Sequence, residues 1–160
     1  MRITSSFTVD AAPDQVFAYL LDVNQVVGCV PGAEISEVVD SQTFRGRLKI
    51  KVGAVQVAYQ GTANIREVAE DDTSATVTIE GEGREIGGQG SVRAGLVLTV
   101  AATPQGGTEV RLETDLTVTG RIAQFGRGAI EDVSSRLIDQ MGRCIGSRLQ
   151  AAPTGGRAAG

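Results

Sequence analysis

Apolar and polar residues alternate with a period of two through a long central stretch of the chain, from Ala33 to Thr119. A period of two places successive side chains on opposite faces of a strand, which is typical of a sheet with one covered face and one face in water. Glycine, proline and acidic residues interrupt the alternation often enough for short antiparallel connections. Including one strand near the N-terminus, the predicted strands are 2–9, 33–39, 42–50, 53–67, 73–83, 89–102 and 107–119.

A change of period marks the element that covers this sheet. From Arg121 to Leu149 apolar residues recur every three or four positions, which predicts an amphipathic helix about 40 Å long. Between residues 10 and 32, Pro13 and Gly32 limit the chain to two short helices. We therefore expect an α+β helix-grip domain over residues 1–149, in which a curved antiparallel sheet of six to seven strands surrounds the C-terminal helix. Residues 150–160 are small, polar and rich in helix breakers, so we expect a disordered linker or tail.

Composition excludes several kinds of chemistry. The 160 residues contain no histidine, which removes histidine-assisted nucleophiles and histidine-ligated metals, and we expect no metal site and no covalent cofactor. A net charge of −4 and only six aromatic residues argue against nucleic-acid binding. The two cysteines, Cys29 and Cys144, are too few for a disulfide scaffold. We expect both to be reduced core residues in a cytosolic protein.

The covered face of the predicted sheet is poor in bulky side chains. The chain has no tryptophan and four phenylalanines, while glycines occur in or beside several strands, at positions 46, 53, 61, 81, 83 and 95. Small residues between a large sheet and a long helix favour an unfilled apolar cavity. A sheet that bends closer to its helix at the glycines is the alternative. Tyr59 lies on the covered face and is the candidate for one orienting hydrogen bond inside the cavity.

Several short motifs together resemble one family. They are Pro13 followed by Val16 and Phe17, Cys29-Val-Pro-Gly32, Lys51-Val-Gly53 followed by Val57-Ala-Tyr-Gln-Gly61, the glycine-rich stretch 81–90, and Gly120-Arg-Ile-Ala-Gln-Phe-Gly126. This set resembles the CoxG family of carbon monoxide dehydrogenase subunits, within the START-like (SRPBCC) superfamily, over about residues 1–150.

The resemblance implies a non-enzymatic accessory subunit with a hydrophobic pocket. Members are associated with recruiting molybdenum-containing CO dehydrogenase to the cytoplasmic membrane, which implies a cytoplasmic protein peripheral at the inner face. Longer members carry a membrane-binding segment after a linker, whereas this chain ends in Gly-Gly-Arg-Ala-Ala-Gly.

Because a dehydrogenase passes its electrons to a lipid-soluble acceptor, we expect the cavity to hold an isoprenoid quinone, menaquinone or ubiquinone. The expected wall consists of Val27, Val30, Leu48, Val57, Tyr59, Val77, Leu96, Ile122, Phe125, Ala129 and Val133. Gly87 and Gly88 form either a lid or a plain hairpin turn. Two other functions remain open: a lipid- or polyketide-binding protein or cyclase-like enzyme, and a membrane tether without ligand.

One predicted strand is unusually basic on its outer face. Arg45, Arg47, Lys49 and Lys51 follow one another at every second position. Such a row could meet an anionic membrane or the dehydrogenase. It could equally be neutralised by glutamates on other strands, for which Glu80, Glu82, Glu109 and Glu113 are the candidates.

Overall fold

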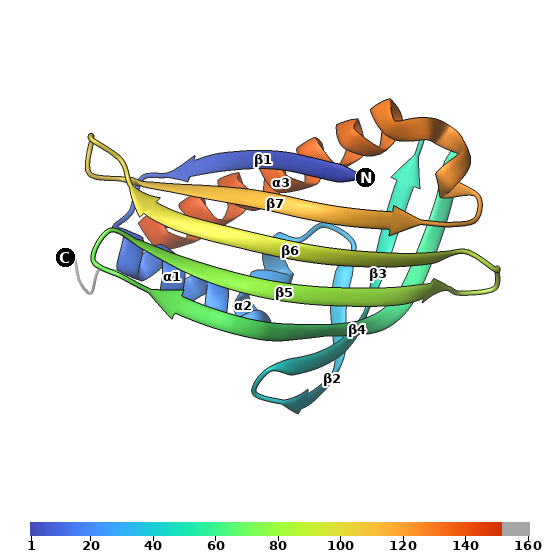
Figure 1. Ribbon diagram of the computed structural model, residues 1–160, viewed down its shortest axis with the longest axis horizontal. Coiled ribbons are helices and arrows are strands. Elements are labelled where there is room, and N and C mark those ends of the chain that lie inside the picture. Colours follow the sequence, from blue (N-terminus) through green and yellow to red (C-terminus); the bar gives the residue numbers. More distant parts are fainter. Residues whose placement is uncertain (152–160) are drawn as a thin grey trace.

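A single antiparallel sheet of seven strands wraps around one long helix in the computed structural model, which describes residues 1–151 (Figure 1). The strand order is β1-β7-β6-β5-β4-β3-β2, so every neighbour except β1 follows its partner in the sequence. The strands are β1 (Arg2–Val9), β2 (Ala33–Asp40), β3 (Thr43–Val52), β4 (Val55–Glu70), β5 (Ser74–Glu85), β6 (Ser91–Ala102) and β7 (Thr108–Val118). The predicted helix-grip architecture is confirmed.

The helices follow the predicted order with one correction. Two short helices, α1 (Pro13–Leu21) and α2 (Val23–Val26), follow β1, and a 3-10 turn η1 (Val27–Cys29) continues α2. The C-terminal segment is not one helix from Arg121, because a 3-10 turn η2 (Ile122–Phe125) precedes α3 (Gly126–Ala151). Gly126 separates them with a φ of 82°, a left-handed conformation that glycine adopts readily. Most of the tail expected at 150–160 lies outside the described residues.

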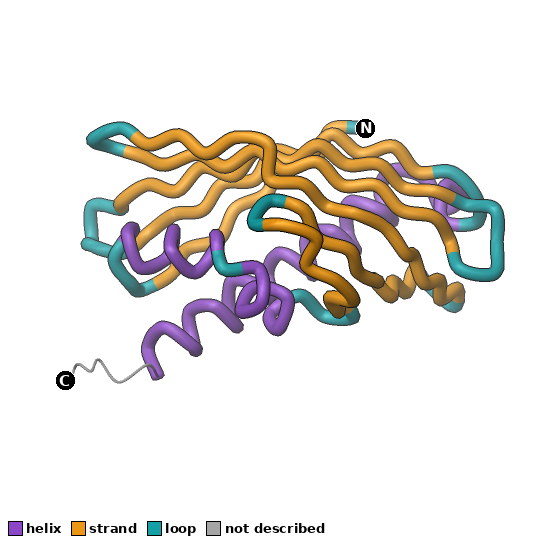
Figure 2. The backbone as a smooth tube through the Cα atoms, turned by 90° about the horizontal axis from the view of Figure 1, so that it is seen from below, coloured by secondary structure: helices purple, strands orange, loops and turns teal. Residues whose placement is uncertain are grey.

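The sheet bends sharply within β4: β3 and the beginning of β4 run steeply across the direction of β5, β6 and β7, and the rest of β4 lies alongside β5 (Figure 1). A row of glycines crosses the sheet here, since Gly46 pairs with Gly61 and Gly61 pairs with Gly83. A Cβ atom at Gly61 would overlap the carbonyl oxygen of Glu82. Glycine therefore permits the close strand approach that bends this region. Figure 2 shows the resulting concave face, with α3 crossing it.

One half of the interior is tightly filled. Its buried residues come from β1, α1, η1, the middle strands and the C-terminal half of α3, and they include Phe7, Phe17 and Tyr19. Ile145 on α3 is completely buried among them. Gly142 lets α3 approach β1, because a Cβ atom there would lie only 2.6 Å from Cγ of Phe7. Three of the six aromatic residues thus fill this half, while Phe44 and Tyr59 line the other.

The two cysteines form a disulfide, which corrects the expectation of reduced thiols. The C-terminal half of α3 crosses η1 and brings Cys29 and Cys144 to a Cα to Cα distance of 5.4 Å. Sequence spacing did not reveal this proximity, because it depends on where α3 crosses the sheet. Cys29 is buried, as predicted.

Arg148 also connects the end of α3 to the short helices beside the disulfide. Its guanidinium donates hydrogen bonds to the Tyr19 hydroxyl at 2.9 Å and to the carbonyl oxygens of Gln25 and Gly28 at 3.2 and 3.4 Å. The Tyr19 hydroxyl in turn donates to the Gln25 carbonyl at 3.1 Å. The end of α3 is therefore joined to α1, α2 and η1 by hydrogen bonds as well as by the disulfide.

Candidate functional site

The other half of the interior contains an apolar cavity of about 440 Å³. It lies between the concave face of β3 to β7 and the N-terminal half of α3, and α2 and η1 add to one side. Its aliphatic wall consists of Val23, Val27, Ile35, Leu48, Ile50, Val52, Val92, Leu116, Val118, Ile122, Ile130, Val133 and Leu137. No buried residue of the tightly filled cluster reaches it. The predicted unfilled space is therefore present.

The cavity exists because its floor has almost no side chains. Glycines 46, 61 and 83 form one row across three strands, and Ala63, Gly81 and Ala94 form a second paired row beside it. All six residues line the cavity. A Cβ atom at Gly81 would meet only the Thr62 carbonyl oxygen, at 3.7 Å, so that position has room for a side chain that it does not use. The absence of bulk rather than a gap between elements creates the volume.

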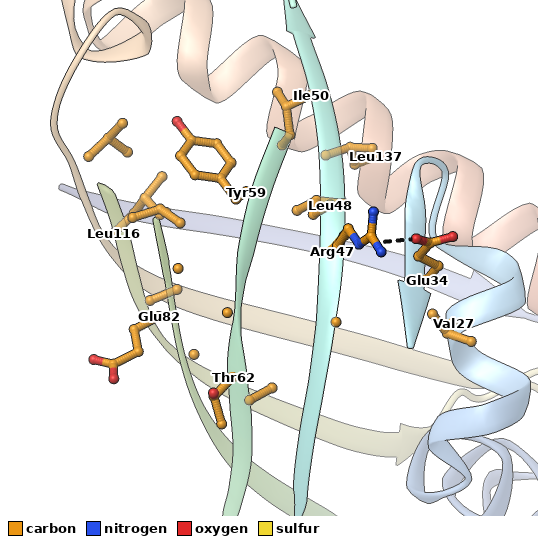
Figure 3. Close-up of a pocket in the computed structure, with 18 of the residues that line it drawn as sticks. Val27, Glu34, Arg47, Leu48, Ile50, Tyr59, Thr62, Glu82, Leu116 and Leu137 are labelled. Carbon is orange, nitrogen blue, oxygen red and sulfur yellow. Dashed lines mark ion pairs between the residues drawn. The ribbon is translucent and has the colours of Figure 1, made fainter. Parts of the chain in front are cut away.

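Tyr59 supplies the main polar group within the apolar wall. The residue is 6% exposed and projects from β4 into the cavity, as Figure 3 shows. Among the described residues, no protein group hydrogen-bonds its hydroxyl within the usual geometric limits. Burial raises the pKa of the phenol, the nearby Glu85 carboxylate raises it further, and Arg121 partly offsets both. The phenol is thus a neutral group, able to donate to or accept from a ligand.

An ion pair lies at the rim of the cavity beside η1. Arg47 on β3 and Glu34 on β2 approach to 3.4 Å, as Figure 3 shows, and Arg45 pairs with Glu37 at 3.5 Å. The register of β2 and β3 places these residues opposite one another. Since both partners of each pair are more than half exposed, each pair contributes little to stability.

The prediction that Glu80, Glu82, Glu109 and Glu113 neutralise the basic strand was wrong. Glu80 pairs with Arg66, Glu82 with Arg93, and Glu113 with Arg2, all away from β3. The partners come instead from β2, the adjacent strand. Lys49 and Lys51 form no ion pair with any described residue. Whether this basic row meets a membrane or a protein stays a prediction.

Five of the eleven predicted wall residues line the cavity, namely Val27, Leu48, Tyr59, Ile122 and Val133. The other six lie elsewhere: Val30, Val77 and Leu96 pack in or against the filled half, Val57 and Ala129 pack in the smaller cluster around Tyr59, and Phe125 is 38% exposed. The alternation of apolar and polar residues identified the covered face correctly, but it does not tell where along that face the cavity lies. That these residues bind a ligand stays a prediction.

The expected lid residues, Gly87 and Gly88, form the β5–β6 turn and do not line the cavity. Gly87 has a φ of 74° and its Cβ position is open, so the turn uses glycine for its backbone conformation. The turn is closed by a hydrogen bond from the Glu85 amide to the Gly90 carbonyl oxygen at 2.8 Å. Its role as a lid stays a prediction.

Sequence reasoning missed Glu85, a buried charged residue at the end of β5. Its side chain is 4% exposed and accepts hydrogen bonds from Arg121 at 2.8 and 3.3 Å. Gly88, Gly90 and Gly120 enclose the carboxylate so closely that a Cβ atom at Gly90 would lie 2.6 Å from Oε1. The pair thereby joins β5 to the chain that enters η2. The parity of β5, continued through the glycine-rich stretch, would have placed Glu85 on the covered face.

The described part of the chain has no group of three or more acidic or cysteine side chains arranged to hold a metal ion. Within the same part, every helix is too short or too polar to span a bilayer.

Residues 5–150 match the model of the CoxG family, which describes the CoxG subunit of carbon monoxide dehydrogenase. No curated protein shows a significant sequence match to the chain.

Similar folds occur among solved structures. A conserved protein from Geobacillus kaustophilus has a TM-score of 0.78 and 19% identity, with 94% of this chain and 95% of that chain covered. The Zhui aromatase/cyclase from Streptomyces sp. R1128 has a TM-score of 0.65 and 14% identity, with coverage of 100% and 98%. A START superfamily protein from Mycobacterium smegmatis has a TM-score of 0.59 and 10% identity, with coverage of 93% and 97%. At these identities the likeness shows a START-like fold.

Proposed function

Since the chain belongs to the CoxG family of carbon monoxide dehydrogenase subunits, we propose that it is a non-enzymatic carrier that binds an isoprenoid quinone and links a molybdenum-containing CO dehydrogenase to the cytoplasmic membrane. The observation that carries the proposal is an aliphatic cavity containing one buried tyrosine hydroxyl without a hydrogen-bond partner among the described residues. A quinone combines an apolar body with carbonyl oxygens that accept hydrogen bonds. The Tyr59 hydroxyl would donate to one of these oxygens.

The apolar wall addresses the main energetic difficulty of such a carrier. An isoprenoid chain gains about 25 cal/mol per Å² when it leaves water, whether it enters a bilayer or a protein. Extraction from a membrane therefore requires a site almost as apolar as the bilayer. The wall consists mainly of valine, leucine and isoleucine, and it meets this requirement.

The cavity volume limits what can be enclosed. A space of 440 Å³ lies within the range of about 300–1,000 Å³ for small-molecule sites. At about 30 Å³ per water-sized group, it accommodates roughly fifteen such groups. That is enough for a quinone ring and the beginning of its chain. A long polyprenyl tail would extend out of the cavity.

A cyclase-like enzyme is the second candidate, favoured by the fold shared with the Zhui aromatase/cyclase. The carboxylates beside the cavity, Glu34 and Glu82, are both engaged in ion pairs with arginines. Tyr59 then remains as the buried titratable group in the wall, which favours binding over acid–base catalysis. The cavity also argues against a tether with a filled core.

The test is quinone uptake from vesicles. The purified protein is incubated with vesicles containing menaquinone or ubiquinone, separated from them, and analysed by native mass spectrometry and by ultraviolet spectra of an organic extract. We expect about one quinone per chain. A protein that stays empty with both quinones would overturn the proposal.

Two variants of β6 make the test specific to the cavity. Ala94→Phe places a ring into the cavity, whereas Val97→Phe places the same ring on the exposed face of the same strand. Uptake should be lost in the first variant and kept in the second. Equal uptake by both folded variants would show that the quinone binds outside the cavity.

A further inference from the structure

Two apolar side chains are exposed at the end of the molecule where η2 and the β3–β4 and β5–β6 turns meet (Figure 1). Ile86, at the start of the β5–β6 turn, is 47% exposed, and Phe125, at the end of η2, is 38% exposed. The Phe125 ring lies over the β3–β4 turn, since a Cβ atom at Gly53 would be 3.3 Å from it. We call Ile86 and Phe125, together with the neighbouring Lys51, Arg84, Arg121 and Arg127, the apical surface.

Basic side chains surround the two apolar residues. Lys51, Arg84, Arg121 and Arg127 are all exposed at this end. The acidic partners here are Glu85, which is buried under Arg121, and Glu131, which pairs with Arg127. Lys51 and Arg84 have no ion-pair partner among the described residues. The apical surface is therefore basic, although the whole chain carries a net charge of −4.

The opposite end has the reverse character. Glu67, Glu70, Asp71 and Asp72 are exposed around the β4–β5 turn, and none forms an ion pair with a described residue. Between the two ends (Figure 1), the exposed Val38 and Val39 on β2 are bordered by the acidic Asp40 and by Glu37, which pairs with Arg45. The β4–β5 turn is thus acidic where the apical surface is basic, and an anionic surface would attract the apical surface more strongly.

We propose that the apical surface docks on an anionic lipid bilayer, with Ile86 and Phe125 inserted among the headgroups and the four basic side chains next to the phosphates. Apolar side chains ringed by arginine and lysine are what an interfacial lipid site requires. This proposal rests on the carrier function proposed above and identifies the surface that meets the membrane.

The same short element connects this surface to the cavity. In η2, Ile122 is buried in the cavity wall, while Phe125 three residues later faces outward. Docking through Phe125 therefore holds one wall of the cavity against the lipid. A quinone whose tail exceeds the cavity could keep that tail in the bilayer while its ring enters the protein.

Vesicle flotation tests the surface without any quinone. The full chain is mixed with vesicles of phosphatidylcholine alone or with phosphatidylglycerol added, and the floating fraction is measured. We expect binding to the anionic vesicles, weakened roughly tenfold or more by Ile86→Ser with Phe125→Ser. Lys51→Gln and Arg84→Gln should each weaken it about fivefold, and added salt should weaken it further.

Val38→Ser with Val39→Ser is the matched control, because these valines are similarly exposed but lie outside the apical surface, next to Glu37 and Asp40. This variant should float like the unchanged protein. Equal flotation of the apical and control variants would overturn the proposal. So would loss of dehydrogenase binding or of self-association in the apical variant with flotation unchanged, since the surface would then be a protein interface.

A single tryptophan gives a second readout, because the chain contains none. The emission of Phe125→Trp should shift to the blue when anionic vesicles are added, whereas that of Val38→Trp should not. No shift at position 125 would overturn the insertion.

Quinone uptake from detergent by the Ile86→Ser, Phe125→Ser variant separates the two proposals. Uptake retained with flotation lost supports both the cavity and the apical surface. Flotation without uptake by the unchanged protein would instead overturn the carrier function and keep the docking surface.

Discussion

The two halves of the interior use glycine in opposite ways. In the filled half, Gly142 removes a side chain so that Phe7 can pack directly against the backbone of α3. In the hollow half, Gly81 also lacks a side chain, but nothing takes the vacant space. The residue type is the same, and the neighbouring bulk decides the outcome. Aromatic side chains from α1 and β1 are present in the first case and absent in the second.

Because of this difference, the two halves of the interior have different roles. The filled half holds the largest buried cluster, the disulfide and the Arg148 hydrogen bonds, so it provides most of the stability. The hollow half gives up packing contacts and gains a volume that a ligand can occupy. We therefore expect substitutions in the first half to affect unfolding and substitutions in the second to affect binding.

The largest expected effect compares two isoleucines of α3. Ile145→Ala in the filled half should lower the free energy of unfolding by about 2–5 kcal/mol. Ile130→Ala should cost roughly 1–2 kcal/mol, because part of that side chain already faces the cavity and has fewer contacts to lose. Urea unfolding measures both. Equal losses would contradict the division into filled and hollow halves.

Removing the disulfide should have the next largest effect. The Cys29→Ser, Cys144→Ser variant frees a loop of 115 residues, for which a loss of about 2–4 kcal/mol is typical. The midpoint of thermal unfolding should fall by roughly 5–15 °C. Scanning calorimetry checks this, with reductant added to the unchanged protein as the parallel measurement. A midpoint unaffected by either treatment would mean that the two cysteines are not joined.

Two glycines of the cavity floor can be compared within the hollow half. Gly61→Ala should cost about 1–3 kcal/mol, since the new methyl group would force β4 and β5 apart. Gly81→Ala should change stability by less than about 1 kcal/mol, because its Cβ position has room. The methyl group at position 81 should instead lower the affinity for quinone, because it occupies part of the cavity. Urea unfolding and quinone titration of both variants would test this, and a stable Gly61→Ala would contradict the bend at that residue.

Most of the fold could be predicted from the sequence because strand and helix periods are local properties. The strand boundaries agree within three residues, and the single apolar parity of β3 to β7 identifies the concave face. The break at Gly126 was missed, since the apolar spacing continues through it while the backbone conformation does not. Local patterns report side-chain direction and say little about one backbone angle.

The site was harder to predict because it depends on where elements cross. Four of the six glycines, at positions 46, 61, 81 and 83, line the floor as predicted, yet Val77 and Leu96, on the same face, pack in or against the filled half. The distinction depends on where α1 covers the sheet, which no local period encodes. The disulfide was missed for the same reason.

The smallest expected effect concerns the Tyr59 hydroxyl. Tyr59→Phe should change stability near neutral pH by under about 1 kcal/mol, because the hydroxyl has no partner among the described residues to lose. Quinone affinity should fall about 2- to 10-fold if the hydroxyl donates to the ligand. Isothermal titration with a short-chain quinone measures this loss, and an unchanged affinity would remove Tyr59 from the proposed recognition.

The raised pKa of Tyr59 adds a dependence on pH. Because burial and Glu85 favour the neutral phenol in the folded state, the folded protein holds this proton more tightly than the unfolded chain, whose tyrosine pKa is about 10. The stability that results is fully present below pH 10 and declines as the pH rises above it. The Tyr59→Phe variant should therefore lose less stability than the unchanged protein between pH 9 and pH 11, as measured by urea midpoints. Since the two proteins differ only at position 59, the difference between them isolates Tyr59. Parallel declines would mean that water reaches the phenol freely, and the hollow half would then be open to solvent at this residue.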